Sequence, residues 1–264
     1  MGGTKKRKNY KFMAGCVITT IVLLFVIIGL FWTPYPPEAV DATAKLAGSS
    51  LKHPFGCDNL GRDILSRVMN GSKITLFVAL GTVAIGGGIG ILIGAFTGYF
   101  GGVVDEILMR IMDAMLAFPS ILLSLVVIAV LGPGTYHAIF ALGIAFIPSF
   151  ARIVRSEFIR LREMEYVKLA RLSGAGNLRI MFVHILPNIR PVLFSTIMIG
   201  FNNAVLAEAS LSYLGIGVQP PYASLGRMLS EAQSYIFVAP GSCIWPGLVL
   251  ILMILGFSLM SDGR

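Results

Sequence analysis

Long runs without a charged side chain constrain this 264-residue chain more than any other feature of its sequence. Residues 12–32, 74–104 and 114–151 contain no Asp, Glu, Lys or Arg. A helix needs about 20 apolar residues to cross the hydrocarbon core of a bilayer, so each run is long enough to span one. Only 13% of the residues are charged, about half the fraction of a typical soluble domain. We therefore predict an all-α membrane protein.

The apolar runs and the breaks within them predict six transmembrane helices. The run 114–151 is too long for one crossing, and the Gly-Pro-Gly turn at 132–134 divides it into two. The second of these two helices is expected to continue into the charged segment that follows. The predicted spans lie in residues 12–32, 74–104, 114–131, 135–151, 191–207 and 241–260.

Basic residues gather in two segments, which predicts how the chain is oriented in the membrane. Residues 1–11 carry five basic and no acidic side chains, and residues 151–190 carry eight basic against three acidic ones. Cytoplasmic loops are enriched in Lys and Arg. With six spans, this rule places both termini, including the tail 261–264, and the segment 151–190 in the cytoplasm. A nucleic-acid footprint is the alternative, but no nucleic-acid motif accompanies these clusters, so no nucleic acid is expected as a partner.

Glycines recur at every fourth position in the second predicted span, at Gly86, Gly90, Gly94 and Gly98. This spacing places them on one ridge of a helix. Lipid provides no hydrophobic drive for helix association, and small residues allow two helix backbones to approach closely. We predict that this ridge packs against another helix. The spacing does not match G-x-G-x-x-G and no strand precedes it, so a dinucleotide site is not expected.

The first outer loop, residues 33–73, is predicted to contain a short amphipathic helix at the membrane interface. Asp58 is suited to begin such a helix, and Asn70-Gly71 is suited to end it. Its apolar residues fall on one helical face: Leu60, Ile64, Leu65, Val68 and Met69.

A metal site in this loop is the alternative, because His53, Cys57 and Asp58 are possible ligands. No second pair of such residues follows at ligand spacing, so no metal site is predicted.

Polar side chains are rare inside the predicted spans. Glu208 lies near the outer end of the fifth span, and Asn202 and Asn203 precede it by one to two turns. An ionisable residue at membrane depth is a candidate for a translocation path. The alternative is a hydrogen bond at a helix end or a packing role, and the sequence leaves both interpretations open.

The basic segment 151–190 has the pattern of helix, glycine elbow and helix. Gly174 and Gly176 interrupt the helical pattern, Asn177 is suited to cap the next helix, and Pro187 is expected to end it. Apolar residues among the basic ones predict a plug for a groove in another protein. A basic loop attracted to anionic lipid is the alternative.

Two stretches of this sequence resemble a known family. Glu165-Tyr-Val-Lys-Leu-Ala-Arg-Leu-Ser-Gly174, then nine residues and His184-Ile-Leu-Pro187, resembles the EAA loop of ABC-importer permeases. Glu208-Ala-Ser-Leu-Ser-Tyr-Leu-Gly-Ile-Gly217 is similar to the dipeptide, oligopeptide and nickel subfamily. Lys168, Leu169 and His184 depart from the EAA pattern. The resemblance implies that the loop couples to an ATPase through Glu165, Lys168, Leu169, Ala170, Gly174, His184, Leu186 and Pro187.

The resemblance also implies a fold, a location and partners. It implies the type I ABC-importer permease fold, with spans two to six in residues 74–260 and coupling helices in the cytoplasmic 4–5 loop. The expected partners are a second homologous permease, two cytoplasmic ATPases, an extracytoplasmic substrate-binding protein and the lipid of a bacterial or archaeal cytoplasmic membrane. The expected cargo is di- or oligopeptides, with nickel or a nickel chelate as the alternative.

Other classes of function fit the sequence less well. The chain lacks the G-x4-G-K-[ST] phosphate loop, so ATP and Mg²⁺ are expected on the partner ATPases, and neither a cofactor nor a catalytic residue is expected here. A stand-alone secondary transporter would need a relay of intramembrane carboxylates, and a membrane-embedded enzyme would need paired catalytic groups. Neither pattern is evident.

Overall fold

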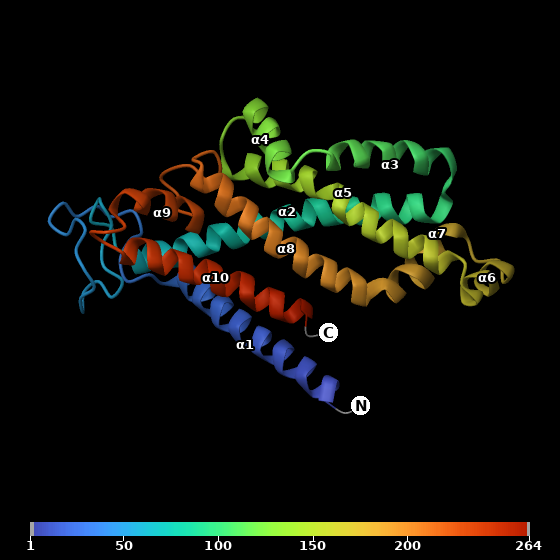
Figure 1. Cartoon of the computed structure of the whole chain (residues 1–264), viewed down its shortest axis with the longest axis horizontal. Helices are drawn as coiled ribbons and strands as arrows, with labels where there is room; N and C mark the ends of the chain where they lie inside the picture. Colours follow the sequence, from blue (N-terminus) through green and yellow to red (C-terminus); the bar gives the residue numbers. More distant parts are fainter. Residues whose placement is uncertain (1–2, 263–264) are drawn as a thin grey trace.

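The computed structural model describes residues 3–262, which form a bundle of long helices and contain no β-strand (Figure 1). This confirms the predicted all-α fold class. The α-helices are α1 (Gly3–Phe31), α2 (Ile64–Phe100), α3 (Gly102–Leu116), α4 (Ser120–Leu131), α5 (Thr135–Arg162), α6 (Glu165–Leu172), α7 (Asn177–Arg179), α8 (Arg190–Tyr213), α9 (Leu225–Ala232) and α10 (Gly241–Asp262). Tighter or wider helical turns are η1 (Ile180–Ile185, π), η2 (Leu186–Ile189, 3₁₀) and η3 (Gln233–Tyr235, 3₁₀).

Among the helices of residues 3–262, five are long and apolar enough to cross a membrane: α1, α2, α5, the helix from Asn177 to Tyr213, and α10. α3 and α4 together make a sixth candidate, but they are bent by 92° relative to each other. The third span predicted in residues 114–131 is interrupted at 117–119, so it counts as a span only if the bent pair crosses the membrane as one broken helix. The break falls before Pro119, because proline lacks an N–H and disfavours helical backbone in the preceding residue.

The turn predicted at 132–134 is present and separates α4 from α5. Gly132, with φ of +87°, ends α4, and α5 begins at Thr135. α5 then runs to Arg162, so it continues into the basic segment as the sequence predicts. The loop before α2 and the helix α9 lie at one end of the long axis, and α6 lies at the other end (Figure 1).

The amphipathic helix predicted in residues 58–70 does not form as a separate element. α2 begins at Ile64 with Asp63 as its N-cap, and it passes through Asn70-Gly71 without a break. Ile64 and Val68 are buried in an apolar cluster with residues of α9 and α10. The apolar face of this segment is therefore covered by protein, and this explains why it continues a spanning helix instead of lying along the lipid interface.

The glycine ridge of α2 (Gly86, Gly90, Gly94 and Gly98) lies directly against α5. A Cβ atom on Gly94 would lie 2.4 Å from the carbonyl oxygen of Ala151, and one on Gly98 would lie 2.6 Å from that of Arg155. No side chain fits at such distances, so the two backbones are in contact. This contact is the packing that the four-residue spacing predicts.

Pro187 does not end the helix that follows the elbow, contrary to the prediction. A π turn, η1, precedes the proline and a 3₁₀ turn, η2, contains it, and the chain then continues as α8. Such turns reroute the backbone hydrogen bonds where proline has no N–H to donate. Asn177 is also not the cap: Gly176 occupies that position, and Asn177 Oδ1 accepts a hydrogen bond from the Tyr99 hydroxyl at 2.9 Å.

Five charged side chains form a cluster at the end of the bundle that carries α9. Arg62 Nε contacts Asp58 Oδ2 at 2.7 Å, and Arg67 also pairs with Asp58. Arg62, Arg67 and Arg227 each donate to Glu231 on α9, at 3.0, 3.0 and 3.1 Å. Asp58, the predicted helix cap, therefore serves instead as an ion-pair partner. Because Arg67 is only 3% exposed, this cluster ties α9 firmly to the first turn of α2.

We predict that Gly94→Ala lowers the melting temperature of the folded protein in detergent. The added Cβ would clash with the α5 backbone, and such overpacking costs about 1–3 kcal/mol. Gly88→Ala is the matched control, because a Cβ at Gly88 meets nothing within 4 Å. The control should melt at or above the temperature of the unsubstituted protein, since alanine favours helix by about 1 kcal/mol. Equal melting of the two variants would contradict the backbone contact.

We also predict that Glu231→Gln destabilises the fold at neutral pH but not in acid. Burial alone would raise the pKa of Glu231, but Arg67, Arg227 and Arg62 outweigh burial and lower it below the ordinary value of 4.5. The stabilisation is therefore present above 4.5 and is lost as pH falls through the lowered pKa. Thermal melting at pH 7 and over a series of pH values that extends well below 4.5 measures this. A difference between variant and unsubstituted protein that stays constant with pH would contradict the prediction.

Candidate functional site

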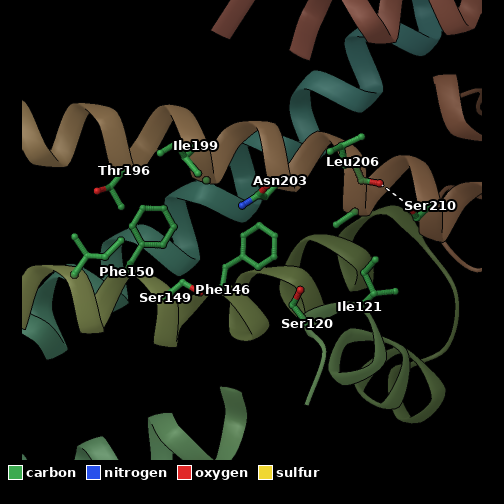
Figure 2. A pocket seen from close by; sticks show the side chains of 13 residues that line it. Ser120, Ile121, Phe146, Ser149, Phe150, Thr196, Ile199, Asn203, Leu206 and Ser210 are labelled. Atoms are coloured by element: carbon green, nitrogen blue, oxygen red, sulfur yellow. Dashed lines mark hydrogen bonds between the residues drawn. The ribbon is translucent and has the colours of Figure 1, made fainter. Parts of the chain in front are cut away.

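An open cavity of about 430 Å³ lies between the start of α4, the middle of α5 and α8. Phe146 and Phe150 of α5 face Asn203 and Thr196 of α8 across this space (Figure 2). The remaining lining residues are Ser120, Ile121, Ser149, Ile153, Ile199, Gly200, Leu206, Ala207 and Ser210. The wall is therefore apolar with interspersed hydroxyl and amide groups, and it contains no charged side chain.

The polar groups of this wall fall into two kinds. The hydroxyls of Thr196 and Ser210 donate to carbonyl oxygens of their own helix at 2.8 Å, so their donors are already used. Within residues 3–262, no hydrogen bond joins the side chain of Asn203, Ser120 or Ser149 to another group. These three side chains are the groups on the wall that can donate to a passing solute.

Two glycines set the position of the Phe150 ring. A Cβ on Gly200 of α8 would lie 2.5 Å from Phe150 Cζ, and one on Gly87 of α2 would lie 3.5 Å from Phe150 Cε1. The ring therefore lies between α2 and α8, and only 2% of the residue is exposed. Sequence analysis missed Phe146, Ser149 and Phe150, because only the packing of α4, α5 and α8 brings them to one cavity.

The structure separates the three polar residues predicted in the fifth span, and only Asn203 lines the cavity. Asn202 faces α10. In the amide orientation that satisfies both ends of its side chain, the nitrogen donates to Ile254 O (3.3 Å) and the oxygen accepts from Ser258 N (3.2 Å). Residues next to each other on a helix point about 100° apart, so neighbouring asparagines reach different surroundings.

Glu208 lies away from the cavity and is fully buried. Its Oε1 accepts a hydrogen bond from the Ser212 hydroxyl at 2.7 Å, and Val218 N donates to the same hydroxyl at 3.0 Å. The other oxygen, Oε2, has no partner at hydrogen-bond distance in the described part of the chain. This carboxyl group therefore connects α8 to the loop that leads to α9.

The elbow consists of α6 and the turn 173–176 that follows it. Gly174, with φ of +81°, reverses the chain after α6, a backbone conformation that side-chain-bearing residues rarely adopt. Val167 packs inside a cluster with residues of η1, whereas Leu169 and Leu172 on the opposite side are 62% and 85% exposed. Two leucines exposed on a charged helix mark a surface that another protein can cover.

The other residues predicted in this loop lie close to the elbow. Lys168 Nζ contacts Glu165 Oε1 at 2.9 Å on the exposed side of α6, and Ala170 is half-buried. His184, Leu186 and Pro187 are half-buried in η1 and η2, which connect the elbow to α8.

No group of three or more His, Cys, Asp and Glu side chains suited to a metal ion occurs within residues 3–262. Cys57 is completely buried, and burial together with the negative charge of Asp63 raises the pKa of its thiol to about 11. A thiol with such a pKa stays protonated at neutral pH and is a poor metal ligand.

Comparison with known proteins gives consistent matches along the chain. Residues 90–263 match the family model for the inner membrane component of binding-protein-dependent transport systems. The dipeptide transport system permease protein of Alkalihalophilus pseudofirmus is 38% identical, over 97% of this chain and 84% of that protein. The glutathione transport system permease protein of Pectobacterium atrosepticum is 41% identical, over 92% and 82%.

Among solved structures, inward-facing forms of the MetNI methionine ABC transporter are similar to this chain. One has a TM-score of 0.54 and 18% identity, and the similarity covers 76% of this chain and 96% of that one. At this identity the match establishes the fold, which is that of a type I importer permease. The region matched by the family model includes the C-terminal part of α2 from residue 90 onward, the cavity and the elbow. The chain therefore belongs to the family of inner membrane components of binding-protein-dependent transport systems.

Proposed function

We propose that this chain is one of two permease subunits of an ATP-driven importer of di- and oligopeptides in a bacterial or archaeal cytoplasmic membrane. The observation that carries the proposal is the elbow, whose exposed leucines lie within the basic segment 151–190 in a chain of this family. In this proposal a second, homologous permease completes the path, and a substrate-binding protein delivers the peptide from outside. Two cytoplasmic ATPases bind ATP and Mg²⁺ and cover the exposed leucines of the elbow.

The way the elbow joins the rest of the chain supports a role in coupling. Val167 fixes the inner face of α6 to η1, and η1 is part of a continuous helix from Asn177 to Tyr213. That same helix carries Thr196 and Asn203 into the cavity. A displacement of α6 by an ATPase is therefore transmitted along one helix to the wall of the path.

The positions of the charged segments support the orientation. The elbow lies at one end of the long axis, and the loop before α2 lies at the other end with α9 (Figure 1). We place the end with the elbow, together with both termini, in the cytoplasm, where Lys- and Arg-rich segments are favoured. The loop and α9 then face the binding protein outside.

The chemistry of the cavity wall favours a peptide over a nickel ion. Among residues 3–262, the lining includes no His, Cys, Asp or Glu, and these are the side chains that bind nickel in proteins. Uncharged donors and acceptors suit the amide groups of a peptide whatever its side chains are. The permease relatives named above act on a dipeptide and on glutathione, and both support this substrate class.

The surroundings of Glu208 argue against a stand-alone, ion-driven transporter. Its carboxyl group faces Ser212 and the loop that leads to α9, outside the cavity wall. A proton or ion relay needs ionisable groups along the path, and the wall offers none. We assign Glu208 to the packing of the outer end of α8.

We predict that Asn203→Leu lowers ATP-dependent peptide uptake about 2- to 10-fold without reducing the amount of folded protein. One hydrogen bond to the substrate, worth about 0.5–1.5 kcal/mol, is lost. Uptake of a labelled dipeptide by the assembled transporter in proteoliposomes measures this. Asn202→Leu is the contrasting variant, because its amide faces α10 and its loss should reduce folded protein. Unchanged uptake by Asn203→Leu would contradict the placement of the path.

We predict that Gly174→Val uncouples ATP hydrolysis from uptake. A β-branched residue at a positive φ is strained by about 1–2 kcal/mol, so the elbow shifts. The amount of peptide transported per ATP hydrolysed should fall, while insertion into the membrane stays normal. Gly176→Val is the matched control, since both glycines have open space around a Cβ but Gly176 has an ordinary φ of −68°. Normal coupling in Gly174→Val would contradict the role of the elbow.

A further inference from the structure

A second, smaller pocket lies beside the elbow, outside the cavity and outside the exposed leucine surface of α6. It has a volume of about 240 Å³ and is formed where the ends of α2 and α5 meet α6. Its lining residues are Tyr99, Arg162, Glu163, Lys168 and Arg171.

The arginines in this pocket are positioned by the end of α2. Arg162 Nη1 donates to the carbonyl oxygens of Gly98 and Tyr99, at 3.2 and 3.4 Å, and Arg162 Nε contacts Glu163. Arg171 Nη2 lies 3.5 Å from the Tyr99 hydroxyl, and its guanidinium carbon lies 5.9 Å from the centre of the Tyr99 ring. Tyr99 is buried, so it gives Arg171 a rigid support.

The pocket carries an excess of positive charge. Arg162, Lys168 and Arg171 line it together with one carboxylate, Glu163. The excess remains when Glu165, the ion-pair partner of Lys168, is added to the count. Each arginine also has N–H groups that the contacts above do not use. An anion with several acceptor oxygens is the ligand that suits such a lining.

The length of the uncharged part of α2 indicates that the pocket lies at the depth of the lipid headgroups. Residues 74–100 of α2 contain no charged side chain, and at about 1.5 Å per residue they extend about 40 Å. This length matches a bilayer with its headgroup regions, so the end of α2 reaches the interface.

Exposed aromatic rings lie next to the pocket at this depth. Phe100 packs edge-on to Tyr99, with ring centres 5.1 Å apart, and stacks with Phe96 at 6.0 Å. Phe96 and Phe100 are 38% and 51% exposed on the outside of the bundle. Aromatic side chains at a helix end are typical of the membrane interface.

We propose that this pocket binds the phosphate of an anionic phospholipid, whose acyl chains lie against Phe96 and Phe100. A free phosphate ion would use the basic residues alone, and an acidic side chain of an ATPase would not need the exposed rings. A phospholipid uses both. Its placement in the cytoplasmic leaflet follows from the orientation proposed above, but the binding itself does not depend on what the protein transports.

The test is a binding measurement on the complete transporter in vesicles of phosphatidylcholine with increasing phosphatidylglycerol. Native mass spectrometry after gentle extraction counts the bound phosphatidylglycerol. Arg171→Gln should weaken its apparent affinity about fivefold, the effect of losing one basic residue near an anionic surface. Arg160→Gln is the matched control: it makes the same charge change at an exposed arginine outside the pocket, and it should bind as the unsubstituted transporter does.

Arg162→Gln gives a second measurement. Because Arg162 also caps the end of α2, the folded fraction of this variant is checked by size exclusion in phosphatidylcholine alone. Equal phosphatidylglycerol binding by Arg171→Gln and Arg160→Gln would overturn the proposal. Displacement of the lipid by millimolar inorganic phosphate would also overturn it and would indicate a site for a free anion. Loss of ATPase subunits from Arg171→Gln in phosphatidylcholine, with lipid binding unchanged, would identify a protein contact instead. Because no transport is measured, failure here is distinct from failure of the proposed function.

Discussion

The contact between the backbones of α2 and α5 is the interaction on which the rest of the bundle depends. In lipid, apolar side chains gain nothing by leaving the bilayer for a helix interface, so helices associate through close packing. The glycine ridge of α2 permits this close packing because it carries no side chains where the backbones of Ala151 and Arg155 approach. α4 then packs on α5, and α8 packs against both α2 and α5, and their arrangement forms the cavity. The position of Phe150 between Gly87 and Gly200 shows that the same principle extends to α8.

The helix from Asn177 to Tyr213 connects the two parts of the candidate site. A regular α-helix cannot contain Pro187 without losing a hydrogen bond, and a break there would separate the elbow from the cavity. The π turn before the proline and the 3₁₀ turn around it keep the helix continuous. Irregular turns of this kind occur often at functional sites, and here they allow one element to contact α6 at one end and the cavity at the other.

Much of this fold is predictable from sequence because the bilayer fixes the length of a spanning helix. The apolar runs, the turn at 132–134, the packing of the glycine ridge and the elbow at Gly174 are all local features. The bend before Pro119 and the passage through Pro187 are not predictable in this way, because the same residue breaks one helix and is accommodated in another. What decides between the two outcomes is the packing of η1 in the core, which is a tertiary property.

The candidate site was harder to predict than the fold for a geometric reason. Asn202, Asn203 and Glu208 have similar chemistry and lie within two turns of one helix, yet they face α10, the cavity and the loop that leads to α9. Polarity in a span identifies residues that need partners, but it does not indicate which neighbouring element supplies them. The hydroxyls of Ser120 and Ser149 carry even less signal, because serine in a helix ordinarily satisfies itself on its own backbone.

Charged residues at the two ends of the bundle are arranged in opposite ways. At the end that carries α9, Arg67 pairs with Asp58 and with Glu231, and these side chains are largely buried, so separating α9 from α2 would leave uncompensated charges in a poorly hydrated place. At the end that carries the elbow, α6 is fixed to the bundle by the apolar contacts of Val167, and most of its charged side chains face outward. Apolar contacts do not depend strongly on direction, unlike ion pairs. Displacing α6 along the bundle therefore costs less free energy than displacing α9. The proposed coupling to an ATPase at the elbow needs this asymmetry, with a rigid end at α9 and a movable elbow joined to one continuous helix.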